Sequence, residues 1–249
     1  MTSLADLHVK LFADGADIDQ IKAQAADPRI VGHTTNPTLA RKAGVTDYTT
    51  FIYRAANIVA PRPISCEVFA DDLPKMVEQG RVLAGISPNI NVKIPVTNTQ
   101  GVFTGPVITE LSQAGITVNV TAVFTISQAK AAARAFAPNA PGYISVFAGR
   151  IADAGIDPSP IVQAVRELCS RHIQIIWASP REVINIWQAD DAGADVITLL
   201  PDLIAKLGSV GKSLDKFSLE TVQMFSRDAI AAGFTIPELN GYGVGGFGG

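Results

Sequence analysis

Cysteine and histidine are scarce in this chain, which limits its disulfide and metal chemistry. The two cysteines, Cys66 and Cys169, are too few for a disulfide framework or a zinc site. The three histidines, His8, His33 and His172, lie far apart in the sequence, and none belongs to a motif with metal-ligand spacing. We therefore expect no metal site.

Basic clusters and long apolar runs are also missing. The 20 Lys and Arg residues are scattered singly among 23 Asp and Glu, and the net charge is −3. This distribution argues against binding to nucleic acid or to a membrane surface. No run approaches the roughly 18–20 apolar residues that a membrane helix needs. Residues 1–6 lack the basic start of a signal peptide, so we expect a cytoplasmic protein.

Short apolar runs alternate with amphipathic segments along most of the 249 residues. The alternation predicts eight strands separated by helices, and so an α/β fold of the (β/α)8 (TIM) barrel type, with one domain over residues 1–236. The strands are expected at 8–14, 29–34, 64–69, 91–94, 117–121, 143–147, 173–178 and 195–199. Helices are expected from Pro37 and at 17–27, 48–59, 71–83, 107–113, 127–136, 160–171, 180–190, 201–207 and 214–232.

Glycine is concentrated in the last residues, 237–249, for which the composition predicts a disordered tail. The pattern Gly241-x-Gly243-x-x-Gly246 formally fits a dinucleotide-binding fingerprint. It follows no strand and opens no helix, so we reject a nucleotide cofactor and expect no cofactor of any kind.

Lys93 lies inside the apolar strand expected at 91–94, although lysine is rarely buried. A lysine near a strand end more commonly extends to solvent. Alternatively, burial disfavours the charged form of a lysine, and the neutral amine can attack a carbonyl carbon. Lys10 is the other lysine within a strand, but it lies near the strand's start, where a structural role is expected.

Polar side chains recur near the strand ends, where catalytic residues gather in such barrels. Because alternate strand residues share a face, Asn91 and Lys93 are expected on the lumen side, as are Asn119 and Thr121. Each residue has an ordinary explanation alone, such as a helix cap or a turn. The polar residues at or near the ends of the expected strands are Asp14, Asn36, Glu67, Lys93, Asn119, Thr121, Ser145 and Ser179.

Several motifs resemble the transaldolase family, in its compact type related to fructose-6-phosphate aldolases. Residues 32–37 (GHTTNP) resemble G-x-T-T-N-P, and residues 92–97 (VKIPVT) resemble V-K-[IV]-P-x-T, which carries a Schiff-base lysine. Residues 11–17, 116–121 and 145–150 resemble the family's first strand, fifth strand and S-P-F-V-G-R turn. The resemblance spans residues 8–207 and rests on the order and spacing of these motifs.

The resemblance implies a role for each matching residue. Lys93 would form the Schiff base with a ketose, and Asp14 would move protons at its C4 hydroxyl. Glu67 and Thr121, with a water, would transfer protons around the Schiff base. Ser145 and Arg150 would bind the substrate phosphate. The complete set of expected substrate-binding residues is Asn36, Thr35, Asn119, Ser145, Phe147, Arg150, Ser179 and Arg181.

The resemblance implies transfer of a dihydroxyacetone unit from a ketose phosphate, such as fructose 6-phosphate or sedoheptulose 7-phosphate, to an aldose phosphate. Aldolase relatives have tyrosine at the position of Phe147 and glutamine at that of Glu67, which favours transfer here. The alternatives are an aldolase that releases free dihydroxyacetone or uses a non-phosphorylated or modified sugar, and a catalytically inactive sugar-binding barrel. The oligomeric state stays open and includes a homo-oligomer.

Three departures from the family pattern affect these expectations. Gly15 replaces a serine or threonine, and Val146 replaces a proline. The family's seventh strand continues A-S-[FI]-[RK], and its basic residue helps to bind phosphate. Here Ser179 is followed directly by Pro180 and Arg181, as if residues were deleted. Either Arg181 substitutes for that basic residue or it is a surface residue of the next helix.

Overall fold

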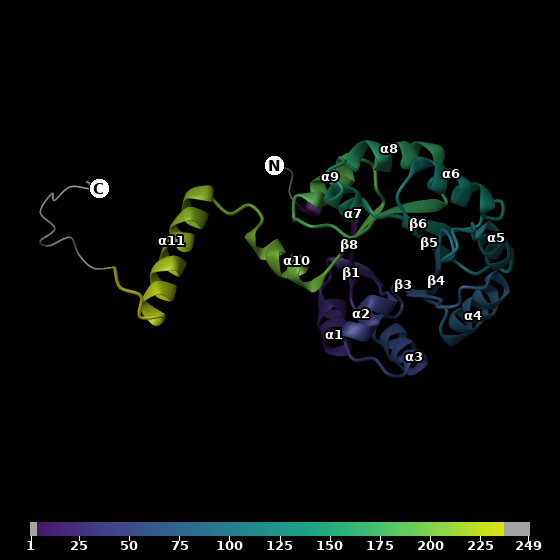
Figure 1. Ribbon diagram of the computed structural model, residues 1–249, viewed down its shortest axis with the longest axis horizontal. Coiled ribbons are helices and arrows are strands. Elements are labelled where there is room, and N and C mark those ends of the chain that lie inside the picture. Colours follow the sequence, from purple (N-terminus) through teal and green to yellow (C-terminus); the bar gives the residue numbers. More distant parts are fainter. Residues whose placement is uncertain (1–3, 237–249) are drawn as a thin grey trace, which may run out of the picture. The chain divides into compact units, whose positions relative to one another are not determined.

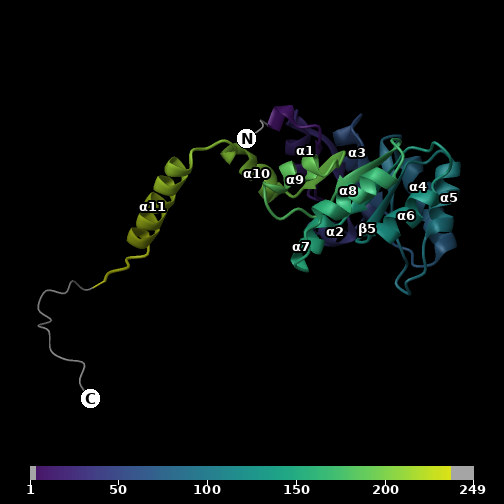
Figure 2. The same cartoon turned by 90° about the horizontal axis from the view of Figure 1, so that it is seen from above.

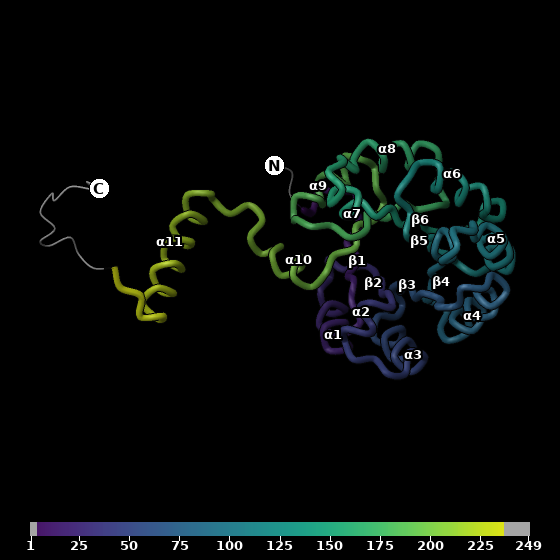
Figure 3. Tube along the Cα trace, viewed as in Figure 1, coloured from purple at the N-terminus to yellow at the C-terminus, as the bar shows by residue number. Residues whose placement is uncertain are grey.

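Eight parallel strands close into a barrel in the computed structural model, which describes residues 4–236. Each strand pairs with the next along the chain, and β8 pairs with β1. The colours therefore run around the ring in sequence order (Figure 3). The strands are β1 (Lys10–Asp14), β2 (Ile30–Thr34), β3 (Ile64–Glu67), β4 (Ile90–Pro95), β5 (Val118–Val123), β6 (Gly142–Val146), β7 (Ile173–Trp177) and β8 (Val196–Leu199).

Helices surround the ring of strands (Figure 1), as the alternating pattern predicts. The (β/α)8 barrel fold is thus confirmed. The helices are α1 (Ile18–Ala26), α2 (Pro37–Lys42), α3 (Tyr48–Val59), α4 (Leu73–Ile86), α5 (Gly105–Gln113), α6 (Ile126–Ala135), α7 (Ala148–Asp153), α8 (Ser159–Leu168), α9 (Asn185–Asp191) and α10 (Pro201–Lys206), with short 3-10 turns η1 (Leu4–Asp6) and η2 (Leu207–Ser209).

Alternation along the strands separates two packed layers. The strand side chains that face the helices are branched and apolar, and they join one continuous core; examples are Val92, Ile94, Val118 and Ile144, all fully buried. Burying each such side chain stabilises the fold by about 1.5–3 kcal/mol. A smaller cluster fills the lower lumen, formed by Phe12, Ile176 and Val196 with Tyr143 packed against them. The polar lumen residues therefore lie above an apolar floor.

The largest differences from the expected helices lie around α7 and at the start of α9. The chain makes a short helix, α7, directly after β6, where the glycine of Ala148-Gly149-Arg150 weakened the helical signal. The helix expected from Pro180 begins only at Asn185. Ser179 has a positive φ of 61°, and the Asn185 side chain accepts hydrogen bonds from the backbone N–H groups of residues 181 and 182. These contacts hold the segment in a turn instead of a helix.

A separate C-terminal unit begins at Ser209 and contains α11 (Leu214–Ala231), close to the helix expected at 214–232. Within this unit Lys212 forms an ion pair with Glu220 and lies over the ring of Phe217. The glycine-rich tail expected at 237–249, with its fingerprint-like pattern, lies outside the described residues. Within residues 4–236, no helix is both long and apolar enough to cross a membrane.

Candidate active site

A cavity opens at the C-terminal ends of the strands, and we call it the mouth cavity. It has a volume of about 80 Å³ and is partly open to solvent. Figure 2 shows α7, which contributes to its wall, at the end of the barrel opposite to the N-terminal η1. The cavity is lined by Asp14, Thr34, Asn36, Lys93, Thr121, Ser145, Phe147, Arg150, Ala178, Ser179 and Thr198.

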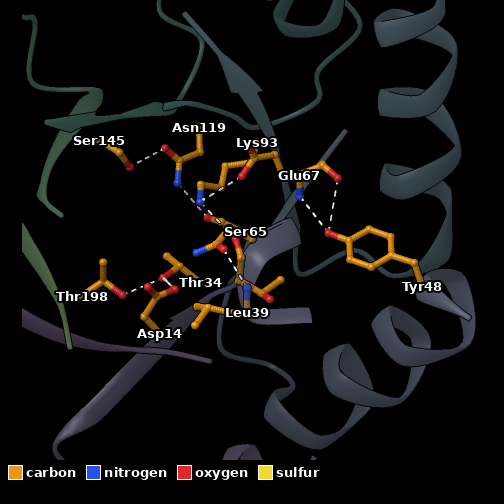
Figure 4. Close-up of polar contacts among 12 residues, drawn as sticks. Asp14, Thr34, Leu39, Tyr48, Ser65, Glu67, Lys93, Asn119, Ser145 and Thr198 are labelled. Carbon is orange, nitrogen blue, oxygen red and sulfur yellow. Dashed lines mark hydrogen bonds and ion pairs between the residues drawn. The ribbon is translucent and has the colours of Figure 1, made fainter. Parts of the chain in front are cut away.

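Lys93 places its amine inside this cavity from the middle of β4. The residue is only 5% exposed, so its side chain does not extend to bulk solvent. Its Nζ lies 3.3 Å from Glu67 Oε2 and donates a hydrogen bond of 3.0 Å to the carbonyl of Thr35. Glu67 is the register partner of Lys93 on β3, which explains why the carboxylate meets the amine (Figure 4). Lys10, by contrast, is exposed at the start of β1, at the opposite end of the barrel.

Tyr48 of α3 fixes the end of β3 from outside the barrel. Its hydroxyl accepts a hydrogen bond from the backbone N–H of Glu67 and donates one to the carbonyl of the same residue (Figure 4). Burial raises the pKa of the Tyr48 phenol, so this hydroxyl keeps its proton and its donor role. The Glu67 backbone is thereby held by a side chain as well as by the neighbouring strand.

Asp14 ends β1 and is the carboxylate that lines the mouth cavity, whereas Glu67 lines a separate pocket together with Tyr48. Burial raises the pKa of the Asp14 carboxyl, opposed in part by the positive charge of Lys93 and by a hydrogen bond from Thr34; the nearby negative charge of Glu67 adds to the increase. Thr34 Oγ1 lies 2.7 Å from Asp14 Oδ1 and 2.6 Å from Thr198 Oγ1. A carboxyl with a raised pKa is suited to exchanging protons near neutral pH.

A hydrogen-bonded row crosses the lumen beside Lys93. Ser145 Oγ donates to Asn119 Oδ1 at 2.8 Å, and Asn119 Nδ2 donates to Ser65 Oγ at 3.0 Å (Figure 4). Asn119 is fully buried and is the register partner of Lys93 on β5. The row therefore fixes the orientation of the Asn119 amide, with Oδ1 towards Ser145 and Nδ2 towards Ser65.

Two other strand-end residues combine a structural contact with a place at the cavity. Asn36 caps α2, because its Oδ1 accepts a hydrogen bond from the backbone N–H of Leu39, which leaves its amide group available to donate. Thr121 is followed by Ala122 at a φ of +56°, where the pairing of β5 with β6 is irregular. The hydroxyl of Thr121 is buried and has no hydrogen-bond partner among residues 4–236.

Arg150 provides the cation at the outer side of the cavity. It lies on α7, and its guanidinium stacks 5.5 Å from the ring centre of Phe147. A Cβ on Gly149 would lie 1.5 Å from the Ser179 carbonyl oxygen, so only glycine allows α7 to approach the β7 loop this closely. The close approach places Arg150 and Ser179 on the same cavity wall.

Arg181 lies away from the site, although the resemblance implied that it could bind substrate there. Its guanidinium binds both carboxylate oxygens of Asp153, and both side chains are about half exposed. It does not line the mouth cavity. Arg150 is therefore the arginine of the cavity wall.

Several residues of the site were not singled out by sequence reasoning. Thr34 and Thr198 line the cavity, and Ser65 lies in the row beneath it. All three lie two residues from a lumen-facing or site residue on the same strand, so strand alternation was the signal that could have found them. Thr35 contributes its backbone carbonyl to Lys93. No cluster of His, Cys, Asp or Glu side chains able to hold a metal ion occurs within the described part of the chain.

Comparison with known proteins decides the family. A profile of the family described as Transaldolase/Fructose-6-phosphate aldolase matches residues 11–239. The chain belongs to this transaldolase/fructose-6-phosphate aldolase family. A probable transaldolase of Exiguobacterium sp. is 38% identical over 194 residues, which cover 77% of this chain and 86% of the relative. A probable transaldolase of Shouchella clausii is 37% identical over 215 residues, or 84% and 95% of the two chains.

Solved structures support the fold of this transaldolase-family member and no more. A structure titled "Native KDPGal structure" matches with a TM-score of 0.55 and 17% identity, over 93% of this chain and all of the other. A thiamine phosphate pyrophosphorylase of Pyrococcus furiosus matches with a TM-score of 0.53 and 11% identity, over 78% and 86% of the two chains. At such low identities the likeness concerns the barrel alone.

Proposed function

We propose that this family member is a transaldolase that moves a dihydroxyacetone unit between sugar phosphates through a Schiff base on Lys93. The observation that carries the proposal is the buried Lys93 amine, 3.3 Å from one carboxylate, Glu67, and in the same cavity as a second, Asp14. An amine enclosed in this way can lose a proton to Glu67 and attack a carbonyl carbon. The names of the relatives agree with this chemistry.

The residues around Lys93 suit each step of the reaction. Attack of the amine on the ketose C2 carbonyl and loss of water give an iminium ion, with Glu67 as the proton carrier. The C3–C4 bond then breaks as Asp14 takes the proton of the C4 hydroxyl; the electron pair of that bond flows into the iminium to form an enamine, and an aldose phosphate leaves. The enamine adds to the acceptor aldehyde, which takes the proton back from Asp14, and water then releases the new ketose phosphate from Lys93. The unpartnered Thr121 hydroxyl is suited to hold the water that enters and leaves these proton transfers.

Hydroxyl and phosphate groups of the substrate match the remaining wall of the cavity. The free amide group of Asn36 is suited to a donor hydroxyl, while Ser145 and Ser179 offer further hydrogen bonds. Arg150 is suited to a phosphate at the far end, because its guanidinium offers a fork of donors. We propose that a single arginine, rather than a pair, holds that phosphate in this chain.

The test compares products with and without an acceptor. The protein is incubated with fructose 6-phosphate alone and together with erythrose 4-phosphate. A transaldolase forms glyceraldehyde 3-phosphate and a seven-carbon ketose phosphate only when the acceptor is present. Accumulation of free dihydroxyacetone without acceptor supports the aldolase alternative, and a parallel incubation with fructose tests the use of a non-phosphorylated donor. Absence of any product and of any covalent adduct would overturn the proposal in favour of an inactive sugar-binding barrel.

A further inference from the structure

Three hydroxyl and carboxylate side chains form a second hydrogen-bonded row on the side of the lumen where the barrel closes. Thr198 of β8, Thr34 of β2 and Asp14 of β1 come from three neighbouring strands (Figure 4). Thr198 is 5% exposed and Thr34 is 3% exposed, so neither hydroxyl is solvated like a surface group. A buried hydroxyl needs a hydrogen-bond partner, and here each one's partner lies within the row.

The direction of the hydrogen bonds follows from counting protons. A hydroxyl carries one proton, and Asp14, in the ionised form that takes the C4 proton in the proposed function, can only accept. The Thr34 proton therefore points to Asp14 Oδ1 over 2.7 Å, and the 2.6 Å contact with Thr198 must be donated by Thr198. We propose that Thr198 is a positioning residue, which acts through Thr34 to hold the Asp14 carboxylate in its orientation and ionised form. This inference rests on the proposed function only for its effect on turnover.

The row acts on a carboxylate that also feels other charges. Lys93 of β4 and Glu67 of β3 act on Asp14 electrostatically, and Arg150 of α7 lines the same cavity. A donated hydrogen bond favours the ionised carboxylate, and a hydroxyl that itself accepts a hydrogen bond is a stronger donor. Loss of the Thr198 hydroxyl should therefore weaken the donation to Asp14 and move its titration to higher pH.

The test uses near-isosteric variants at both hydroxyls. Thr198→Val removes the donor, whereas Thr198→Ser keeps it. We expect Thr198→Val to lower kcat/KM for ketose cleavage by roughly tenfold, because small displacements of a reacting group are costly. The acid limb of its pH profile should move to higher pH. Thr198→Ser should keep the rate and the pH profile of the parent protein, because it keeps the hydroxyl. If only the volume of the side chain mattered, the serine variant would be impaired and the valine variant would not.

A double-mutant cycle tests whether Thr198 acts through Thr34. In the Thr34→Val background the further change Thr198→Val should alter kcat/KM by less than about twofold, because the connection to Asp14 is already lost. If the two effects multiply independently, or if Thr198→Val keeps the rate and pH profile of the parent protein, the inference is wrong.

A measurement without substrate separates this inference from the proposed function. The titration of the Asp14 carboxyl carbon, followed by ¹³C NMR, should shift to higher pH in Thr198→Val and return in Thr198→Ser. An unshifted titration overturns the positioning role even in an active enzyme. A parent protein that acts on no ketose overturns the proposed function, while the titration still decides the role of Thr198.

Discussion

At the scale of single residues, the decisive feature is a lysine enclosed by groups that can exchange its proton. Lys93 contacts Glu67 and the Thr35 carbonyl, and it shares its cavity with Asp14. The far wall of that cavity has a different chemistry, because Arg150 supplies positive charge there. Reactive carbon and phosphate would thus be held by different residues, which allows the two roles to be tested separately.

The two arginines near the cavity give a matched pair of variants. Arg150→Ala should raise KM for fructose 6-phosphate by about ten- to hundredfold, because a hydrogen bond to a charged group is worth roughly 1.5–3 kcal/mol. Its effect on non-phosphorylated fructose should be much smaller. Arg181→Ala should leave both KM values nearly unchanged, since that guanidinium binds Asp153 outside the cavity. Steady-state kinetics with both donors checks this, and a large KM effect of Arg181→Ala would contradict it.

Individual site residues differed in how far the sequence could predict them. Lys93 and Glu67 were recognisable because a charge inside an apolar strand is unusual, and strand register brings them together. Thr34 and Thr198 are not unusual in this way, since threonine is common in strands. Their role depends on hydrogen bonds to residues of other strands. Arg181 could not be placed from sequence, because its partner Asp153 is 28 residues away.

At the scale of elements, the contact between α7 and the β7 loop determines the shape of the phosphate end. Gly149 donates its backbone N–H to the carbonyl of Ala178 over 3.2 Å, and its missing side chain admits the Ser179 carbonyl. Sequence periodicity predicted neither α7 nor the late start of α9, because both depend on this contact and on the positive φ of Ser179. Short elements with tertiary contacts carry little local signal.

A substitution at Gly149 tests this contact. Gly149→Ala should reduce the free energy of unfolding by about 1–3 kcal/mol, because the new methyl group collides with backbone that must move. It should also raise KM for a phosphorylated donor, since Arg150 is the next residue. Gly85→Ala is the matched control: it lies in α4 with open space around its Cβ, and alanine favours a helix by up to about 1 kcal/mol. Urea unfolding distinguishes them, and equal effects of both changes would contradict the account.

At the scale of the whole molecule, the eightfold alternation of elements was predictable from sequence. Each strand is a short apolar run, and the helix-facing side chains such as Val92 and Ile144 are completely buried. Such runs need helices on one side and lumen packing on the other, which a closed parallel barrel provides. The sequence also predicted a helix at 214–232, found as α11, but it did not predict that the segment from Ser209 onward forms a unit of its own.

The barrel wall also contains a buried histidine that makes stability depend on pH. His33 is 1% exposed, and its ring nitrogens have no hydrogen-bond partner within the described residues. Burial, with a smaller effect of the Arg62 charge, lowers the pKa of His33 from 6.5 to about 4. As pH falls below about 6.5, His33 binds a proton in the unfolded chain but not in the folded one. The free energy of unfolding therefore falls until about pH 4, where the folded chain also binds the proton.

This dependence can be measured by unfolding the protein at two pH values. The histidine should account for a loss of about 2 kcal/mol in the free energy of unfolding between about pH 7 and pH 5. His33→Val should remove that part of the loss, whatever its effect on stability at neutral pH. His8→Val, at an exposed position, should keep the dependence of the parent protein. An unchanged pH dependence in His33→Val would contradict a buried, neutral His33.

Reductive trapping shows whether Lys93 forms a covalent Schiff base with a ketose. The protein is treated with fructose 6-phosphate and borohydride, digested, and analysed by mass spectrometry. We predict a reduced sugar adduct on the peptide that contains Lys93, its loss in Lys93→Met, and its persistence in Lys10→Met, which changes the exposed lysine at the opposite end of the barrel. Two results would contradict the account: an adduct on another residue, or no adduct with any ketose tested. Full activity of Lys93→Met would contradict it as well.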